Sequence, residues 1–89
     1  MDIEIKATEE EKRLVVEALI RLNGIRHLNY MSQATIAMET DIKPSKIRVI
    51  LADLMTEGSI IQYVVDDNRI VKRYYYTVEQ AGREKYLSQ

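Results

Sequence analysis

The sequence predicts a small α+β fold that is mainly α, and three observations support this prediction. The 89 residues suffice for one domain with a modest core. Apolar residues recur at helical spacing between Ile42 and Gly58. After Gly58 the pattern changes to two strand-like runs, separated by the turn cluster Asp66-Asp67-Asn68. We therefore expect a single domain over residues 1–89, with helices before a β-hairpin and one helix after it.

The segment from Ile42 to Gly58 carries the strongest helix signal. Pro44 suits the first turn of a helix, and Gly58 suits the left-handed position just past its end. Spacings of i, i+3, i+4 and i+7 place four apolar residues in one stripe: Ile47, Ile50, Leu51 and Leu54. The opposite side of the helix carries Ser45, Val49, Ala52 and Thr56. This helix is expected to bury one side and to expose small, polar and basic residues on the other.

An amphipathic helix is predicted from about Thr8 to Asn23, with Gly24 ending it. Thr8 and Glu11 have the spacing of a capping box, in which each side chain bonds the backbone of the other residue. The side of this helix that faces the core is predicted to consist of Leu14, Val15, Ala18, Leu19 and Leu22. Val16 and Ile20 lie off that side, which leaves two interpretations open: a wide core stripe or a dimer contact.

Ser32 is expected to cap a second helix, from about Gln33 to Glu39, with Ile36 and Ala37 facing inward. Thr40-Asp41 then turns the chain into the helix of residues 44–56. Two helices joined by a tight turn, over about residues 32–57, form a helix-turn-helix arrangement. In that arrangement the second helix presents its outer side to the major groove of DNA.

The two strand-like runs are Ser59–Val65 and Arg69–Tyr76, a hairpin over about residues 59–76. Both of its faces carry apolar residues, so the pattern does not decide which face is buried. A short extra strand is expected at Leu28–Met31. Thr77 and Gln80 have capping-box spacing and predict a last helix over about 78–88. Val78, Ala81 and either Tyr86 or Leu87 are expected to pack inward.

Composition excludes several classes of function. The hydrophobic fraction of 46% and the charged fraction of 30% indicate a globular chain without a membrane span. Without cysteine, with His27 as the single histidine and without a glycine-rich phosphate loop, we expect no metal, no cofactor and no enzyme activity, and a cytoplasmic location. The formal net charge is −1, yet residues 43–48 and 69–73 are basic without any acid. Any nucleic-acid contact is therefore expected at these two segments.

The element order, together with S-Q-A-T-I-A, I-K-P-S-K-I-R and E-G-S-I, resembles the winged helix-turn-helix transcription regulators. The likeness is greatest to small bacterial, archaeal and archaeal-viral members, and D-N-R at 67–69 looks like the wing motif of MarR-type regulators. The resemblance covers Leu14 to the C-terminus. It implies a three-helix core with a two- to three-stranded β-wing and a C-terminal helix. It further implies sequence-specific binding of double-stranded DNA by a nucleoid-associated homodimeric regulator, expected to be a repressor.

The resemblance also implies roles for individual residues. Lys46 would reach guanine acceptors and Val49 a thymine methyl group, while Lys43, Ser45 and Arg48 would meet phosphates. Ser32, Gln33 and Thr35 would contact the DNA backbone. Arg69 would enter the adjacent minor groove, with Lys72 and Arg73 behind it. The structural alternative is that Arg48, Lys72 and Arg73 only solvate exposed surfaces.

Two expectations concern partners. The dimer surface is expected to include Val16, Ile20, Tyr86 and Leu87, and no small-molecule effector is expected because a short chain has little room for a pocket. The alternative function is a winged-helix protein–protein interaction module that does not bind DNA, for which the near-neutral charge is the main argument.

Overall fold

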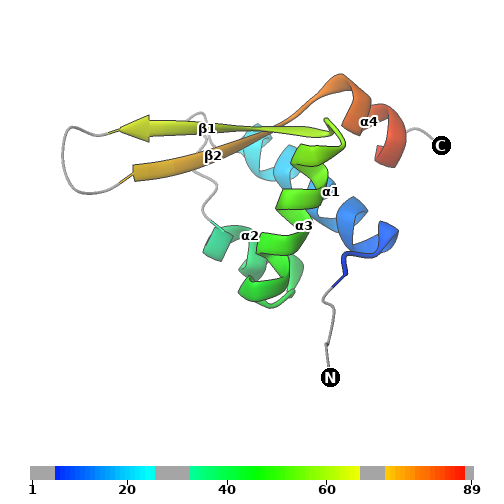
Figure 1. The fold of residues 1–89 in the computed structure, drawn as a ribbon, viewed down its shortest axis with the longest axis horizontal. Helices are drawn as coiled ribbons and strands as arrows, with labels where there is room; N and C mark the ends of the chain where they lie inside the picture. Colours follow the sequence, from blue (N-terminus) through cyan, green and yellow to red (C-terminus); the bar gives the residue numbers. More distant parts are fainter. Residues whose placement is uncertain (1–5, 26–32, 67–71, 88–89) are drawn as a thin grey trace.

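The computed structural model describes residues 6–25, 33–66 and 72–87 of the chain. Within them the fold is a small α+β fold, mainly helical, as predicted, with four helices and one antiparallel two-stranded sheet. The elements are α1 (Glu9–Ile25), α2 (Gln33–Thr40), α3 (Pro44–Thr56), β1 (Ile60–Asp66), β2 (Lys72–Val78) and α4 (Gln80–Leu87) (Figure 1). The predicted strand at Leu28–Met31, His27, the Ser32 cap and Arg69 lie outside the described residues.

Helix α1 begins with the predicted capping box. The backbone N–H of Glu11 donates to Thr8 Oγ1 at 3.1 Å, and the N–H of Thr8 donates to Glu11 Oε1 at 3.0 Å. The prediction that Gly24 ends this helix is wrong, because α1 continues through Gly24 to Ile25. A glycine weakens a helix by only about 1 kcal/mol, so α1 can continue through Gly24.

The hydrophobic core forms around α1, which packs against α2, α3, α4 and β2. Val15, Leu19 and Leu22 are buried as predicted, but Leu14 is 42% exposed. Val16 instead is fully buried, so for this residue the core-stripe interpretation holds. The reason is that neighbouring elements cover α1 on several sides, which shifts the centre of its buried arc away from Leu14.

Helices α2 and α3 are joined by the predicted tight turn. Asp41 has a φ of 59°, a left-handed conformation that aspartate tolerates better than most residues. The Thr40 hydroxyl donates to the carbonyl of Ile36 at 2.7 Å, which ties the end of α2 back on itself. Ile36 and Ala37 are buried, and Ile42 packs against the core after the turn. The predicted stripe of α3 is also buried: Ile47, Ile50, Leu51 and Leu54.

Helix α3 ends in a Schellman motif at Gly58, which has a φ of +79°. The N–H of Gly58 donates to the carbonyl of Met55 at 3.1 Å, and the N–H of Ser59 donates to that of Leu54 at 2.9 Å. Ser59 is buried, and its carbonyl accepts the N–H of Glu79 at 2.9 Å. Three residues therefore connect α3 to β1 and bring the start of α4 beside the same turn.

The hairpin pairs Ile60 with Val78 at its inner end and Asp66 with Lys72 at its outer described end. The strands project beyond the helices (Figure 1). Its inward face, which the sequence left undecided, carries Ile60, Tyr76 and Val78, and all three are buried. The outer half is not covered by the helices, and its large exposed residues are Tyr63, Val64 and Tyr74.

The predicted capping box at Thr77 is wrong. Strand β2 continues to Val78, because Val78 is buried opposite Ile60, and α4 begins only at Gln80. Ala81 is consequently exposed instead of inward-facing, and Gly82 takes the buried position. A Cβ atom on Gly82 would overlap the carbonyl oxygen of Ser59.

We expect Gly82→Ala to lower the free energy of unfolding by about 1–3 kcal/mol, the usual range for overpacking. The clash is with backbone, which cannot move without opening the turn after α3. At an open helical site the same change would stabilise the helix by about 1 kcal/mol.

Urea unfolding followed by circular dichroism measures this change. Arg83→Ala, at an exposed position of the same helix, is the control and should shift the free energy of unfolding by no more than about 0.5 kcal/mol. A stability gain in Gly82→Ala would contradict the close contact.

Candidate functional site

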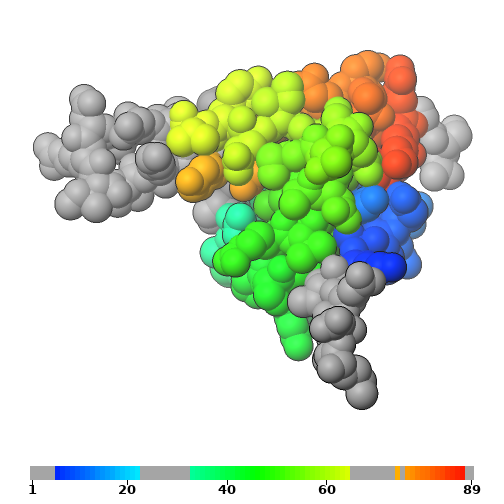
Figure 2. All heavy atoms as spheres, in the orientation of Figure 1, coloured from blue at the N-terminus to red at the C-terminus, as the bar shows by residue number. Residues whose placement is uncertain are grey.

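The outward side of α3 is the first candidate surface. Ser45, Arg48 and Ala52 are exposed and Val49 is half-buried, in agreement with the expected polarity of this helix. Figure 2 shows α3 in green across the front of the molecule, uncovered by the other coloured elements. The N-cap residue Lys43 is exposed, and its side chain makes no capping hydrogen bond. The exposed side chains of this surface are small, polar or basic. The small ones allow another molecule to come close to the backbone of α3.

Lys46 differs from its neighbours on α3. Its Nζ lies 2.8 Å from Oε2 of Glu11, on α1, and its side chain is 33% exposed. The hydrogen bond from Lys46 and those from Thr8 hold the pKa of Glu11 below its usual value. Lys46 is thus part of an interhelical ion pair, which sequence reasoning did not find because Glu11 was assigned only to the α1 cap.

The remaining residues that were expected to contact DNA lie on α2 and on the hairpin, and the structure describes only some of them. Gln33 and Thr35 are half-buried in the first turn of α2. Ser32 and Arg69 lie outside the described residues. Lys72 and Arg73 stand at the outer described end of β2, opposite Asp66 and Val65. Two of the expected cations are thus exposed at α3: Arg48 on the helix and Lys43 at its N-cap. The two basic residues of β2 lie at the end of the hairpin farthest from its buried inner end.

The four expected dimer residues separate into two groups. The prediction that Val16 and Tyr86 belong to a dimer surface is corrected. Only 0% and 5% of their surface is exposed, so almost none of it is accessible to a second chain. Ile20 and Leu87 are half-buried and pack at the edge of the core. Leu14, expected in the core, is a large exposed apolar residue on α1.

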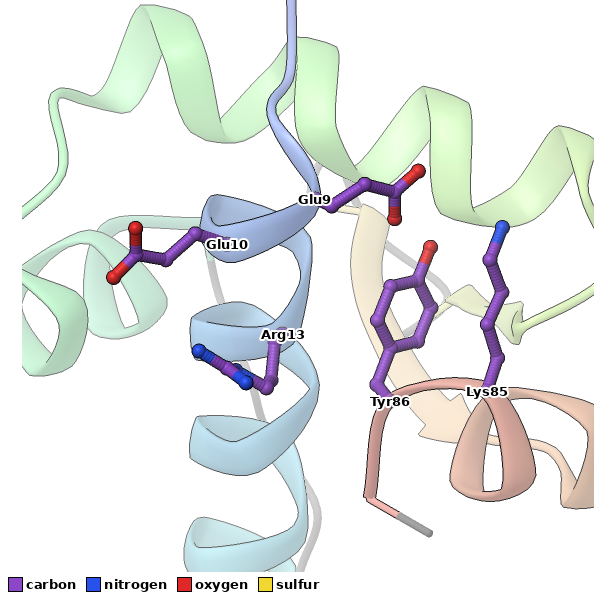
Figure 3. A pocket seen from close by; sticks show the side chains of 5 residues that line it. All are labelled: Glu9, Glu10, Arg13, Lys85 and Tyr86. Carbon is purple, nitrogen blue, oxygen red and sulfur yellow. The ribbon is translucent and has the colours of Figure 1, made fainter. Parts of the chain in front are cut away.

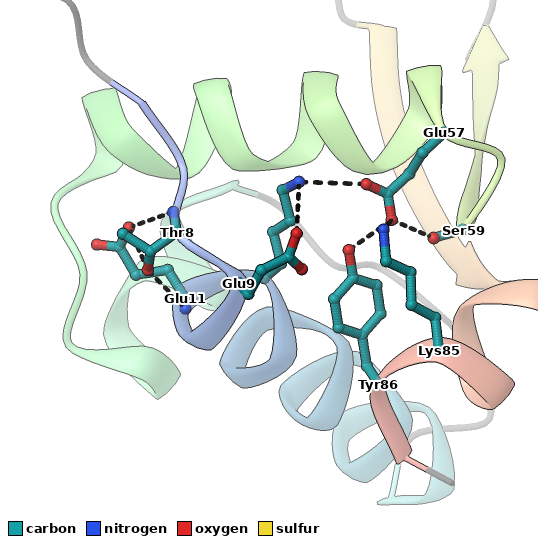
Figure 4. Close-up of polar contacts among 8 residues, drawn as sticks. Thr8, Glu9, Glu11, Glu57, Ser59, Lys85 and Tyr86 are labelled. Atoms are coloured by element: carbon teal, nitrogen blue, oxygen red, sulfur yellow. Dashed lines mark hydrogen bonds and ion pairs between the residues drawn. The ribbon is translucent and has the colours of Figure 1, made fainter.

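Sequence reasoning gave no role to Glu57, yet its carboxylate joins α1 and α4 to the turn that follows α3. Oε2 accepts hydrogen bonds from Ser59 Oγ at 2.6 Å and from the Tyr86 hydroxyl at 2.5 Å, and Lys85 Nζ lies 3.4 Å away. Oε1 accepts from Lys12 Nζ at 3.2 Å. Figure 4 shows Ser59, Lys85 and Tyr86 converging on this side chain. We call these five residues the Glu57 cluster.

The Glu57 cluster has a clear electrostatic signature. Burial alone would raise the pKa of Glu57, but hydrogen bonds from Ser59, Tyr86 and Lys12 outweigh it and lower the pKa to about 2. Burial and the neighbouring carboxylate raise the pKa of Tyr86. A signal in the sequence was present, since an acid at the end of a helix opposes the helix dipole and needs cations nearby.

Beside the cluster, an open pocket lies between α1 and α4. It is lined by Glu9, Glu10, Arg13, Lys85 and Tyr86 (Figure 3). It continues along α1 into a second depression lined by Leu14, Glu17 and Leu87. Both signs of charge flank its apolar residues. Its openness suits contact with another surface better than enclosure of a small molecule.

Other kinds of site find no counterpart in the described part of the chain. Residues 6–25, 33–66 and 72–87 contain no group of three or more histidine, cysteine or acidic residues placed to hold a metal ion. None of the helices in these ranges combines the length and apolar character that crossing a bilayer requires. Comparison with models of known protein families and with curated proteins finds no match.

We expect Glu57→Gln to lower the free energy of unfolding at neutral pH by about 3 kcal/mol, from the lowered pKa of Glu57. Because the folded-state pKa lies below the ordinary value, the stabilisation is present above about pH 4.5 and is lost as the pH falls toward about 2. The wild-type and variant proteins should therefore converge in stability at low pH.

Urea unfolding at intervals from about pH 7 to about pH 2 tests this prediction. Glu84→Gln, at an exposed position of α4, serves as the matched control and should stay within about 0.5 kcal/mol of wild type. A difference between wild type and Glu57→Gln that is constant over the whole pH range would show that the charge of Glu57 is not what stabilises the fold.

Proposed function

We propose that this chain is a winged helix-turn-helix protein that binds specific sequences of double-stranded DNA and regulates transcription as a homodimeric repressor. The observation that carries the proposal is the uncovered outward side of α3, on which Ser45, Arg48 and Ala52 are exposed, while α2 packs against this helix and supports it. A helix with these properties, second in a helix–turn–helix, has the dimensions and chemistry to lie in a major groove.

Each part of α3 has its own role in this proposal. Ser45 and Ala52 are small, so they let the helix approach the base edges closely. Val49 meets thymine methyl groups, and Lys46 meets guanine acceptors. Lys43 and Arg48 contact phosphates, Lys43 at the positive end of the helix. Phosphate contacts supply most of the affinity, and base contacts supply the choice of sequence.

The neighbouring elements extend the contact. Gln33 and Thr35, at the start of α2, approach the DNA backbone together with Ser32. The hairpin acts as the wing. Lys72 and Arg73 lie at the outer described end of β2, and together with Arg69 they contact the adjacent minor groove. The projection of the strands beyond the helices supports this role, because a wing must reach past the body that carries it (Figure 1).

The proposed dimer uses the depression along α1 and α4. Leu14 is 42% exposed, and Leu87 and Ile20 offer further apolar surface near the edge of the core. Arg13 and Glu17 flank Leu14 and lie 3.8 Å apart within one chain, so the border of the apolar contact carries no net charge. Two copies read two half-sites about one helical turn apart, which gives a pseudo-palindromic operator.

A second candidate function is a protein–protein interaction module. The exposed Tyr63, Val64 and Tyr74 on the hairpin and the net charge of −1 favour it. The salt dependence of duplex binding separates the two functions, because an interaction module does not release counterions from DNA.

Random-sequence duplex should bind the wild-type protein at low salt, with an affinity that falls steeply as salt rises. Arg48→Ala should weaken all sequences alike and reduce the slope of log K against log salt by about 0.9, the effect of one lost phosphate contact. Fluorescence anisotropy of a labelled duplex at several salt concentrations measures both quantities.

Arg83→Ala removes an exposed arginine from α4 and is the charge-matched control, which should keep the wild-type slope. Absence of duplex binding at low salt, or binding that does not weaken with salt, refutes the proposed function. Selection of bound duplexes from a random pool then identifies the operator, on which Lys46→Ala should relax one base position.

Sedimentation equilibrium at micromolar concentration should show a dimer, and Leu14→Glu should convert it to monomer by placing a charge in an apolar contact. Leu14 is already exposed in the monomer, so the fold should persist. Met38→Glu, at an 84% exposed position of α2, is the matched control and should remain dimeric. A wild-type protein that sediments only as monomer rules out the dimer.

A further inference from the structure

The ion pair between Glu11 and Lys46 joins α1 to the first turn of α3. Lys46 Nζ and Glu11 Oε2 are 2.8 Å apart, and both side chains are partly shielded, with 33% and 21% of their surface exposed. Lys43 and Arg48, on either side of Lys46 in the sequence, are exposed. Of the three cations in residues 43–48, the middle one is therefore matched by a carboxylate that the fold brings to it.

The carboxylate of Glu11 is fixed independently of Lys46. Its other oxygen, Oε1, accepts hydrogen bonds from the backbone N–H of Thr8 at 3.0 Å and from Thr8 Oγ1 at 3.1 Å. These bonds belong to the cap of α1. Lys46 can leave the pair by rotating its flexible side chain, whereas the two hydrogen bonds to Thr8 hold Glu11 at the cap of α1. Contact of Lys46 with any other anion thus requires it to give up the Glu11 carboxylate.

We propose that Glu11 is an intramolecular competitor of DNA: its carboxylate holds Lys46 in the free protein, so DNA must either displace Lys46 from Glu11 or bind without this cation. This inference rests on the proposed function. On random duplex, Lys46 would exchange one anionic partner for another, so the exchange gains little. At a guanine, a well-placed contact adds about tenfold or more in discrimination, which the ion pair does not match.

Glu11→Gln is the variant that tests the proposal, because glutamine at the third helical position still completes a capping box. Lys46→Met removes the cation while keeping a long, helix-compatible side chain. The four proteins of this cycle are wild type, each single variant and the double variant. Glu10→Gln, at an exposed position in the same turn of α1, controls for the loss of one negative charge.

With random duplex, Glu11→Gln should bind about three- to fivefold more tightly than wild type, the ordinary strength of such an ion pair. Its slope of log K against log salt should steepen by about 0.9, since Lys46 now releases one more counterion. Lys46→Met should change random binding little in the wild-type background and should abolish the gain in the Glu11→Gln background. With the selected operator, Glu11→Gln should gain at least as much as with random duplex, because the wild-type protein must break the ion pair there to free Lys46.

Three results would overturn the inference while leaving the proposed function standing: a gain in Glu11→Gln that equals that of Glu10→Gln, a gain that survives in the double variant, or an operator affinity that Glu11→Gln leaves unchanged. Urea unfolding of the four proteins without DNA tests whether Glu11 and Lys46 interact. If their substitutions change the free energy of unfolding additively, the two side chains do not interact and the inference is overturned. If none of the four proteins binds duplex at low salt, the proposed function fails, and the inference fails with it.

Discussion

The carboxylate of Glu57 is the interaction on which the arrangement of the elements depends. A negative charge at the end of α3 opposes the helix dipole, so the position is unfavourable in isolation. Lys12 from α1 and Lys85 from α4 offset that charge, and the hydroxyls of Ser59 and Tyr86 satisfy its remaining acceptor sites. Helices α1 and α4 and the turn between α3 and β1 thereby meet at one side chain, which fixes α4 and the start of the hairpin relative to α3.

Much of the fold could be predicted because its signals are local. The capping box of Thr8 and Glu11, Pro44 in the first turn of α3 and Gly58 after its last turn each depend on residues within one helical turn. The errors arise where distant neighbours decide. Leu14 is exposed because of how other elements surround α1, and β2 extends through Thr77 because Val78 pairs with Ile60 and is buried.

The same distinction applies to the candidate site. The exposure of Ser45, Arg48 and Ala52 follows from the helical period of α3, so the sequence was sufficient to predict it. The partner of Lys46 could not be predicted, because Glu11 approaches it only through the packing of α1 against α3. A run of basic residues in a sequence therefore overstates the charge that the folded surface presents.

The three-residue connection after α3 also determines where this chain can change in length over its evolution. An insertion between Gly58 and Ile60 would separate the Ser59 carbonyl from the N–H of Glu79 and from the close contact at Gly82. Lengthening the hairpin beyond Tyr63 and Val64, which are exposed, would leave both of these contacts at its inner end in place. Related proteins should therefore differ in the reach of their hairpins and share the angle at which the hairpin leaves the helices.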